Sequence, residues 1–300
     1  MKNRIIGITC VIASATLYGL CAVLTKNVSR NVTVAMMSVG RGAMGALLLF
    51  LLSILRGKPI HIYGKNLGKV ALTGTVGNAA TLVLLNLAYG YLPVGTATTI
   101  HFMYPAAVCL IGAFFFREKL HISTWITLGI CLLSMTLFMD QFQQKQYPGV
   151  VFALLSVATW TFQMVYLERS GILKEDKISV GFIFCCVICL SGLLYGGYTD
   201  TLAVGPALKA LPGITLIALL NNVLAMLLLQ LGIQLVGAGI TAVLSVFEPV
   251  SSILFGWILL DEALSAKQAL ASVLIIVSMM VMILFSGRQP EEQLKSERQS

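Results

Sequence analysis

The sequence predicts an all-α integral membrane protein of ten transmembrane helices, arranged as two inverted repeats of five helices. Hydrophobic residues make up 58% of the 300 positions and charged residues only 11%, which leaves too little polar surface to cover a water-soluble globule. Apolar stretches long enough to cross a bilayer recur along the whole chain. In addition, a motif in the middle of the chain returns near its end at a fixed separation.

The apolar stretches define the predicted helices. A hydrocarbon core about 30 Å thick requires about 20 apolar residues of helix. Segments of this kind are separated only by short connectors and cover residues 5–26, 32–55, 69–91, 94–116, 122–140, 148–167, 178–198, 212–235, 238–260 and 265–286. The first segment follows a basic start and imitates a cleavable secretory signal, but its apolar run continues past Ala15 to Val23, which indicates a retained span.

The two halves of the chain are predicted to be diverged copies. The motif recurs at an offset of 144 residues, and a second set of matches has an offset of 142. The matched pairs are Asn78 and Asn222, Gly95 and Gly239, Pro105 and Pro249, Gly112 and Gly256, Glu118 and Glu262, Gly7 and Gly149, and Ser14 and Ser156. We therefore expect a first repeat over 1–140, a linker over 141–147, a second repeat over 148–287 and a disordered polar tail over 288–300. Duplicated membrane halves are typical of secondary transporters.

The basic residues predict the orientation in the membrane. Most of the 20 lysines and arginines fall in loops that are cytoplasmic if both termini are cytoplasmic, as the positive-inside rule requires. Because each copy has an odd number of spans, the second copy then enters the membrane upside down relative to the first. The net charge of +8 is spread over these loops, so it does not predict a nucleic-acid partner.

Three predicted spans carry a residue that is rare inside a membrane. They are Arg41, His101 and Glu248, and a charge at the bilayer centre costs at least about 2.5–3.5 kcal/mol. Arg41 and Glu248 are expected near the midplane, where Arg41 is suited to hold a carboxylate and Glu248 to accept a proton or hold an amine. Two structural alternatives stay open: an Arg41–Glu248 pair that only ties helices together, and a His101 that only packs.

Further polar and aromatic residues in the spans are candidates for binding or translocation. They are Tyr18, Asn78, Tyr104, Trp160, Gln163 and Asn222. Interhelical hydrogen bonding is the alternative for each of them, although Tyr18 and Trp160 are also suited to face an organic cation. Pro105 and Pro249 each remove a backbone donor, which predicts a helix kink and a free carbonyl near the midplane.

No cofactor or metal is predicted. All seven cysteines lie in predicted spans, and although Cys186 and Cys189 have the spacing of half a metal site, no second pair or histidine lies near them in the sequence. The chain has no phosphate-binding Gly-x-x-x-x-Gly-Lys-Ser/Thr motif, which argues against an ATP-driven motor. Glu248 and a distant His101 are a poor set for acid–base catalysis, so an enzyme is not expected; a non-transporting sensor or scaffold is the other class considered.

At these residues the chain resembles the drug/metabolite transporter superfamily, and within it the EamA-type exporters of ten spans in two repeats. The resemblance covers nearly the whole chain. It rests on Tyr18-Gly19 with Lys26, on Arg41, on Tyr104-Pro105 with Arg117-Glu118-Lys119-Leu120, and on Phe247-Glu248-Pro249-Val250 with Gly256-Trp257 and Asp261-Glu262. Tyr18 stands where the family usually has tryptophan.

The resemblance implies a secondary carrier of the plasma membrane, with a central cavity between the repeats that opens alternately to either side. We expect export of small polar metabolites such as amino acids or their derivatives, with Arg41 and Glu248 lining the cavity. The alternative is proton-coupled efflux of organic cations, in which Glu248 exchanges protons for the cation. Expected partners are a small-molecule substrate, membrane lipid and, in the alternative, a coupling proton.

Overall fold

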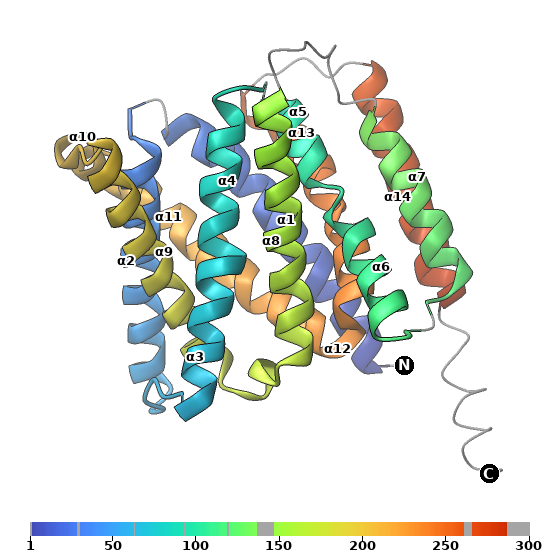
Figure 1. Ribbon diagram of the computed structural model, residues 1–300, viewed down its shortest axis with the longest axis horizontal. Coiled ribbons are helices and arrows are strands. Elements are labelled where there is room, and N and C mark those ends of the chain that lie inside the picture. The colour runs from blue at the N-terminus through green and yellow to red at the C-terminus, as the bar shows by residue number, and fades with distance from the viewer. Residues whose placement is uncertain are drawn as a thin grey trace.

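The protein is a bundle of helices (Figure 1). The structure is a computed structural model that describes residues 2–28, 31–62, 64–92, 94–118, 120–136, 147–260 and 266–286, and all regular secondary structure within these ranges is helical. Six helical stretches are long and apolar enough to cross a membrane, and four shorter apolar helices accompany them. The predicted class, a multi-pass all-α membrane protein, is confirmed. The predicted linker and polar tail lie almost wholly outside the described residues, as do Lys119, Asp261 and Glu262.

The elements follow the chain in two halves. The first half contains α1 (Lys2–Val28), α2 (Val34–Leu55), α3 (Gly64–Leu72), the π-helix η1 (Thr73–Ala79), α4 (Ala80–Tyr89), α5 (Val94–His101), α6 (Tyr104–Phe115) and α7 (Ile122–Thr136). The second contains α8 (Tyr147–Arg169), the 3₁₀ turn η3 (Ile172–Lys174), α9 (Lys177–Thr199), α10 (Val204–Lys209), α11 (Leu211–Ile217), the π-helix η4 (Ala218–Ala225), α12 (Met226–Ser245), α13 (Phe247–Leu260) and α14 (Ala266–Ser286).

Several predicted spans differ from the observed helices. The predicted spans 212–235 and 238–260 are not separated by a loop, because helix runs from Leu211 to Ser245 with a single non-helical residue, Gly237 (φ 83°, ψ 163°). Instead, the helices break at 102–103 and at 246. Both breaks lie just before a proline, Pro105 or Pro249. The backbone nitrogen of proline carries no hydrogen, so it cannot donate a hydrogen bond to the preceding turn. The count of ten transmembrane helices therefore stays a prediction.

The first helices of the two halves run in opposite directions. Near the start of α1, a Cβ atom on Gly7 would lie 2.6 Å from Val236, and at the end of α8 the Glu168 carboxylate lies against the neighbouring Gly237. The start of α8 is at the other end of the bundle, where Gly149 packs on Leu92. The end that carries Gly7, Glu168 and Gly237 is called the N-side face below.

The second helices of the two halves, α2 and α9, meet through their backbones. A Cβ atom on Gly42 would lie 2.5 Å from the backbone nitrogen of Cys189, and one on Gly192 would lie 2.9 Å from the backbone nitrogen of Val39. In lipid, apolar surface gives little drive for association, so such close packing of small residues holds helices together. This seam fixes α2, and with it Arg41, against the second half.

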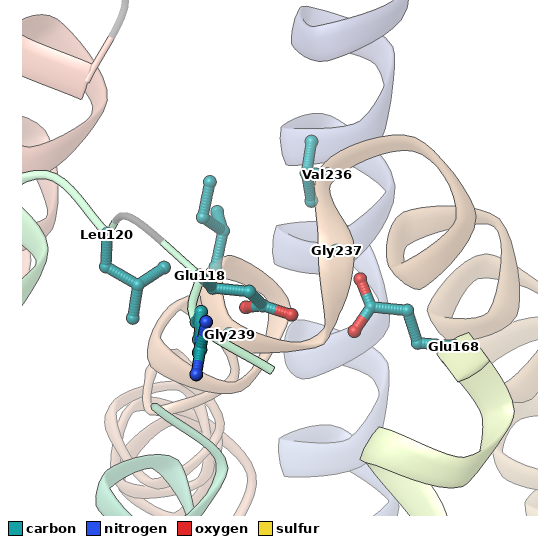
Figure 2. A pocket seen from close by; sticks show the side chains of 8 residues that line it. Glu118, Leu120, Glu168, Val236, Gly237 and Gly239 are labelled. Atoms are coloured by element: carbon teal, nitrogen blue, oxygen red, sulfur yellow. The ribbon is translucent and has the colours of Figure 1, made fainter. Parts of the chain in front are cut away.

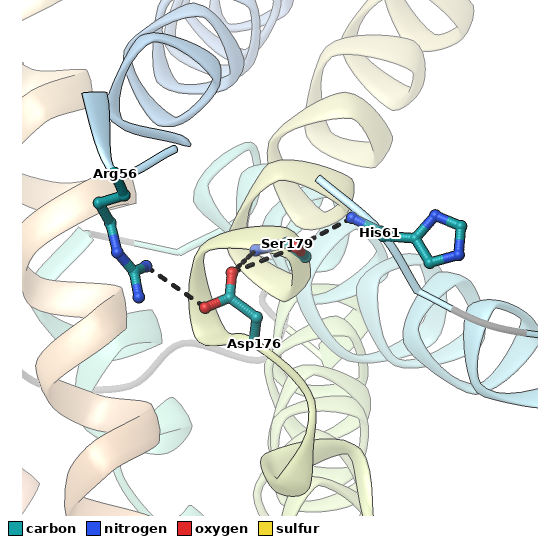
Figure 3. A network of polar contacts seen from close by, with 4 residues as sticks. All are labelled: Arg56, His61, Asp176 and Ser179. Carbon is teal, nitrogen blue, oxygen red and sulfur yellow. Dashed lines mark hydrogen bonds and ion pairs between the residues drawn. The ribbon is translucent and has the colours of Figure 1, made fainter. Parts of the chain in front are cut away.

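An ion pair fastens the same seam at the N-side face. Arg56, just after α2, lies 3.3 Å from the Asp176 carboxylate, and Asp176 also accepts from the backbone nitrogen of Ser179 as the N-cap of α9. The backbone nitrogen of His61 donates to the Ser179 hydroxyl at 3.2 Å (Figure 3). Both charged side chains are more than a third exposed, so the pair contributes little to stability.

The π-helices lie at matched positions of the two halves. η1 contains Asn78 and η4 contains Asn222, the pair related by the offset of 144. A π-helix inside an α-helix is often a feature of functional sites. The side chains around η1 and η4 are therefore candidates for a functional site.

We expect Gly42→Ala to lower the thermal stability of the purified protein, because the added methyl group meets backbone atoms of Cys189 that cannot move aside. Overpacking of this kind costs about 1–3 kcal/mol. Gly197→Ala, on the same helix as Cys189 but with nothing within 4 Å of its Cβ position, is the matched control. Thermal unfolding of both variants in detergent tests the expectation, and equal melting temperatures would contradict it.

Candidate functional site

Arg41 in α2 is held by two neutral amides from η4. Its Nη2 donates to Asn221 Oδ1 at 2.9 Å and to Asn222 Oδ1 at 3.3 Å, and its Nε lies 3.4 Å from the same Asn222 oxygen. In the described part of the chain, Nη1 makes no hydrogen bond and no carboxylate pairs with the guanidinium. The positive charge of Arg41 is therefore positioned but not neutralised by these partners.

Asn221 is a site residue that the sequence analysis missed. Its only signal was its place in an Asn-Asn pair within an apolar run, and the repeat matched Asn222 but not Asn221. Because a π-helix turns less per residue than an α-helix, its wider turn brings consecutive side chains closer to one direction. Both amides can then reach one guanidinium, and Asn221 also contacts the thiol of Cys21 in α1.

Glu248, the second residue of α13, lies close to α1. A Cβ atom on Gly19 of α1 would lie 2.7 Å from the Glu248 carbonyl oxygen, which also accepts from the Ser251 hydroxyl at 2.8 Å. The side chain is half-buried and interacts electrostatically with Tyr18, Tyr104 and Tyr89. Among the described residues, no hydrogen bond or ion pair reaches its carboxylate.

The structure does not support the alternative in which Arg41 and Glu248 only tie two helices together. No ion pair joins them in the described ranges. Instead, Tyr18 and Cys21 of α1 are each close enough to interact electrostatically with both charges, and the Tyr18 hydroxyl donates to the sulfur of Met226 at 3.7 Å. One helix thus presents two side chains that lie near both Arg41 and Glu248.

His101, Tyr104 and Trp160 form an aromatic cluster beside Glu248. The His101 ring lies 5.5 Å from Tyr104 and 6.2 Å from Trp160, and Tyr104 and Trp160 are 6.2 Å apart between centroids. His101 Nδ1 and the Ser156 hydroxyl are 3.0 Å apart, so Ser156, known from the sequence only as the repeat partner of Ser14, fixes the ring. The cluster brings α5, α6 and α8 together next to α13.

The remaining candidates lie apart from Arg41, around η1. Gln163 of α8 is fully buried against Gly77, and neither its amide oxygen nor its amide nitrogen has a hydrogen-bond partner. Asn78 is half-buried in η1. Gln163 and Cys21 are related by the offset of 142, and each contacts the π-helix of the opposite half. The two halves thus repeat a packing arrangement with different polar groups.

The structure contains a cavity of about 490 Å³ at the N-side face (Figure 2). Its lining consists of Arg117, Glu118, Leu120, Glu168, Val236, Gly237, Gly239 and Ile240. Next to Glu248, buried Tyr104 packs against the rings of His101 and Trp160. Figure 2 shows the carboxylates of Glu118 and Glu168 on either side of the backbone that leads to Gly239.

Comparisons with known proteins identify the family and the fold of the chain. The model of the EamA-like transporter family matches residues 5–139 and 147–284. An uncharacterized transporter of Clostridium kluyveri is 23% identical over 243 residues, which cover 78% of this chain and 72% of that protein. A crystal structure of a protein aligns with a TM-score of 0.79 and 19% identity over 95% of this chain and 99% of the other, which shows a shared fold.

The family match extends over both halves and confirms the resemblance found from the residues. Together with the apolar helices, it makes membrane transport the activity of the chain. The chain belongs to the EamA-like transporter family and contains two copies of the family's repeat.

Proposed function

We propose that the protein exports small zwitterionic metabolites, such as amino acids or their derivatives, by alternating access across the plasma membrane. In this proposal the N-side face and both termini are cytoplasmic. The observation that carries it is that Arg41 and Glu248 both lie near Tyr18 and Cys21, and that neither has an ion-pair partner among the described residues. A zwitterion supplies the missing partner for each, with its carboxylate at Arg41 and its ammonium at Glu248.

The geometry at Arg41 supports recognition of a carboxylate. Asn221 and Asn222 engage Nη2 and Nε, which fixes the plane of the guanidinium and leaves Nη1 to donate. Neutral partners keep the full positive charge available, whereas a carboxylate partner would compete with the substrate. Hydrogen bonds to charged groups contribute about 1.5–3 kcal/mol each, enough to make Arg41 dominate affinity.

One observation favours a second candidate, proton-coupled efflux of organic cations. Glu248 interacts electrostatically with Tyr18, Tyr104 and Tyr89, and Trp160 lies close to Tyr104. Aromatic faces and one carboxylate together bind organic ammonium groups through cation–π attraction and charge. In this second candidate Arg41 has no direct role in binding.

The two candidates predict opposite results for Arg41→Ala. In proteoliposomes with a panel of labelled amino acids, small amines and quaternary cations, we expect counterflow of a zwitterion that the substitution abolishes. Arg56→Ala, which removes an exposed ion pair at the N-side face, is the control and should transport normally. If only cations move and Arg41→Ala leaves them moving, the zwitterion proposal fails.

Asn221→Asp tests whether the free charge of Arg41 is what binds substrate. The aspartate has the shape of asparagine but pairs ionically with the guanidinium, so we expect the half-saturating zwitterion concentration to rise by about tenfold or more. Measured concentration dependence of counterflow decides this. An unchanged value in a folded variant would show that the substrate carboxylate does not rely on Arg41.

Glu248→Gln addresses the second candidate. Glutamine cannot exchange a proton for a cation, so exchange of organic cations driven by a pH gradient should be lost entirely. Zwitterion counterflow, which needs no proton, should weaken but keep its dependence on Arg41. Cation uptake driven by a pH gradient that survives in Glu248→Gln would rule out Glu248 as the coupling group.

A further inference from the structure

A cluster of charged residues joins the two halves of the protein at the N-side face. Arg169, the last residue of α8, forms an ion pair with the Glu118 carboxylate that follows α6. Its Nε also lies 3.8 Å from Glu168 Oε2, and its guanidinium carbon lies 4.5 Å from the centre of the Phe116 ring. One guanidinium thus connects the end of a first-half helix to the end of a second-half helix.

Glu168 connects the cluster to a third element, α12. Its carboxylate accepts a hydrogen bond from the backbone nitrogen of Ala238, the first residue after the non-helical Gly237. A Cβ atom on Gly237 would lie 3.0 Å from Glu168 Oε1, and the positive φ also favours glycine. The carboxylate therefore caps the helical segment 238–245 and complements the positive end of its dipole.

Glu118 is positioned by the way α6 ends. Its backbone nitrogen donates to the Gly112 carbonyl at 3.0 Å. A Cβ atom on Gly112 would lie only 2.7 Å from Glu118 Oε2, so the carboxylate packs directly on this glycine. Arg117, with φ 54°, turns the chain back toward α6. One helical turn deeper, the Cys109 sulfur lies 3.9 Å from the Gly239 carbonyl oxygen, so α6 and α12 are in contact below the cluster.

We propose that Glu118, Glu168 and Arg169 form a latch that keeps the N-side face closed while the site opens to the other side. The helix α6 runs from Tyr104 to the latch, and the segment 238–245 runs from the latch to the break before Glu248. Release of the latch would free one end of α6 and one end of the segment 238–245. The other end of α6 carries Tyr104, and the other end of the segment leads to Glu248. The cavity of about 490 Å³ opens on the latch from outside, so solvent reaches these ions while Cys109 stays buried.

The repeat places a different set of charged residues at the positions equivalent to the latch. The offset of 142 relates Glu168 to Lys26 at the end of α1, and the offset of 144 relates Glu118 to Glu262. The full set of latch residues is therefore not repeated in the other copy.

This inference rests on the alternating access of the proposed function but not on the substrate, and it is tested without transport. Cys109 is a native reporter because it lies directly beneath the latch. In nanodiscs, we expect Arg169→Ala to raise the rate of Cys109 alkylation by N-ethylmaleimide about fivefold, as loss of two partly exposed ion pairs implies. Mass spectrometry of the Cys109 peptide measures the rate without removal of the other cysteines.

Two controls separate latch release from general loosening. Cys131, equally buried between α7 and α14, should label at the native rate, and Arg56→Ala should leave both cysteines unchanged. If Arg169→Ala exposes Cys131 as well, Glu118→Gln and Glu168→Gln, which keep side-chain shape, replace it in the comparison. Native Cys109 labelling in every variant that keeps Cys131 protected overturns the latch, whatever the outcome of the transport assays.

Discussion

Inside a bilayer no water is available to hydrogen-bond a backbone group that a helix leaves free, so every interruption of a membrane helix has to be compensated within the protein. This constraint governs where the chain departs from regular helix. The departures are the two π-helices, the breaks at 102–103 and 246, and the non-helical Gly237. At Gly237 the Glu168 carboxylate supplies the compensation by accepting from the Ala238 backbone nitrogen, and the two π-helices and the break at 246 lie next to candidate functional residues.

The duplicated scaffold carries different chemistry in its two copies. Tyr104 and Glu248 occupy equivalent positions, both just after a helix break and close to each other across the interface between the halves. Asn222 binds Arg41, while its counterpart Asn78 lies in a π-helix whose neighbour Gln163 has an unpaired amide. The two copies share their π-helices and their breaks before a proline, and they differ in the side chains placed there.

Much of this architecture could be predicted from the sequence. The membrane class, the duplication and the family follow from apolar length, the offsets of 144 and 142, and motifs such as Glu248-Pro249. The unneutralised state of Arg41 could not be predicted, because it depends on Asn221, and a π-helix has no sequence signature that would turn two adjacent asparagines toward one guanidinium. Similarly, the sequence predicts separate spans over 212–235 and 238–260, whereas Glu168 caps the segment after Gly237 and the helices continue.

The last helices of the two halves are equivalent elements that lie side by side. α7 and α14 pack against each other at one side of the bundle (Figure 1), joined by the hydrogen bond from Thr127 to the Ser278 carbonyl oxygen at 2.8 Å. Equivalent elements that pair in this way resemble the self-complementary contact of a homodimer. In a dimer of identical subunits every substitution appears twice, so equivalent positions cannot hold a phenol in one copy and a carboxylate in the other. Fusion of the two copies into one chain is what allowed Tyr104 and Glu248 to become different.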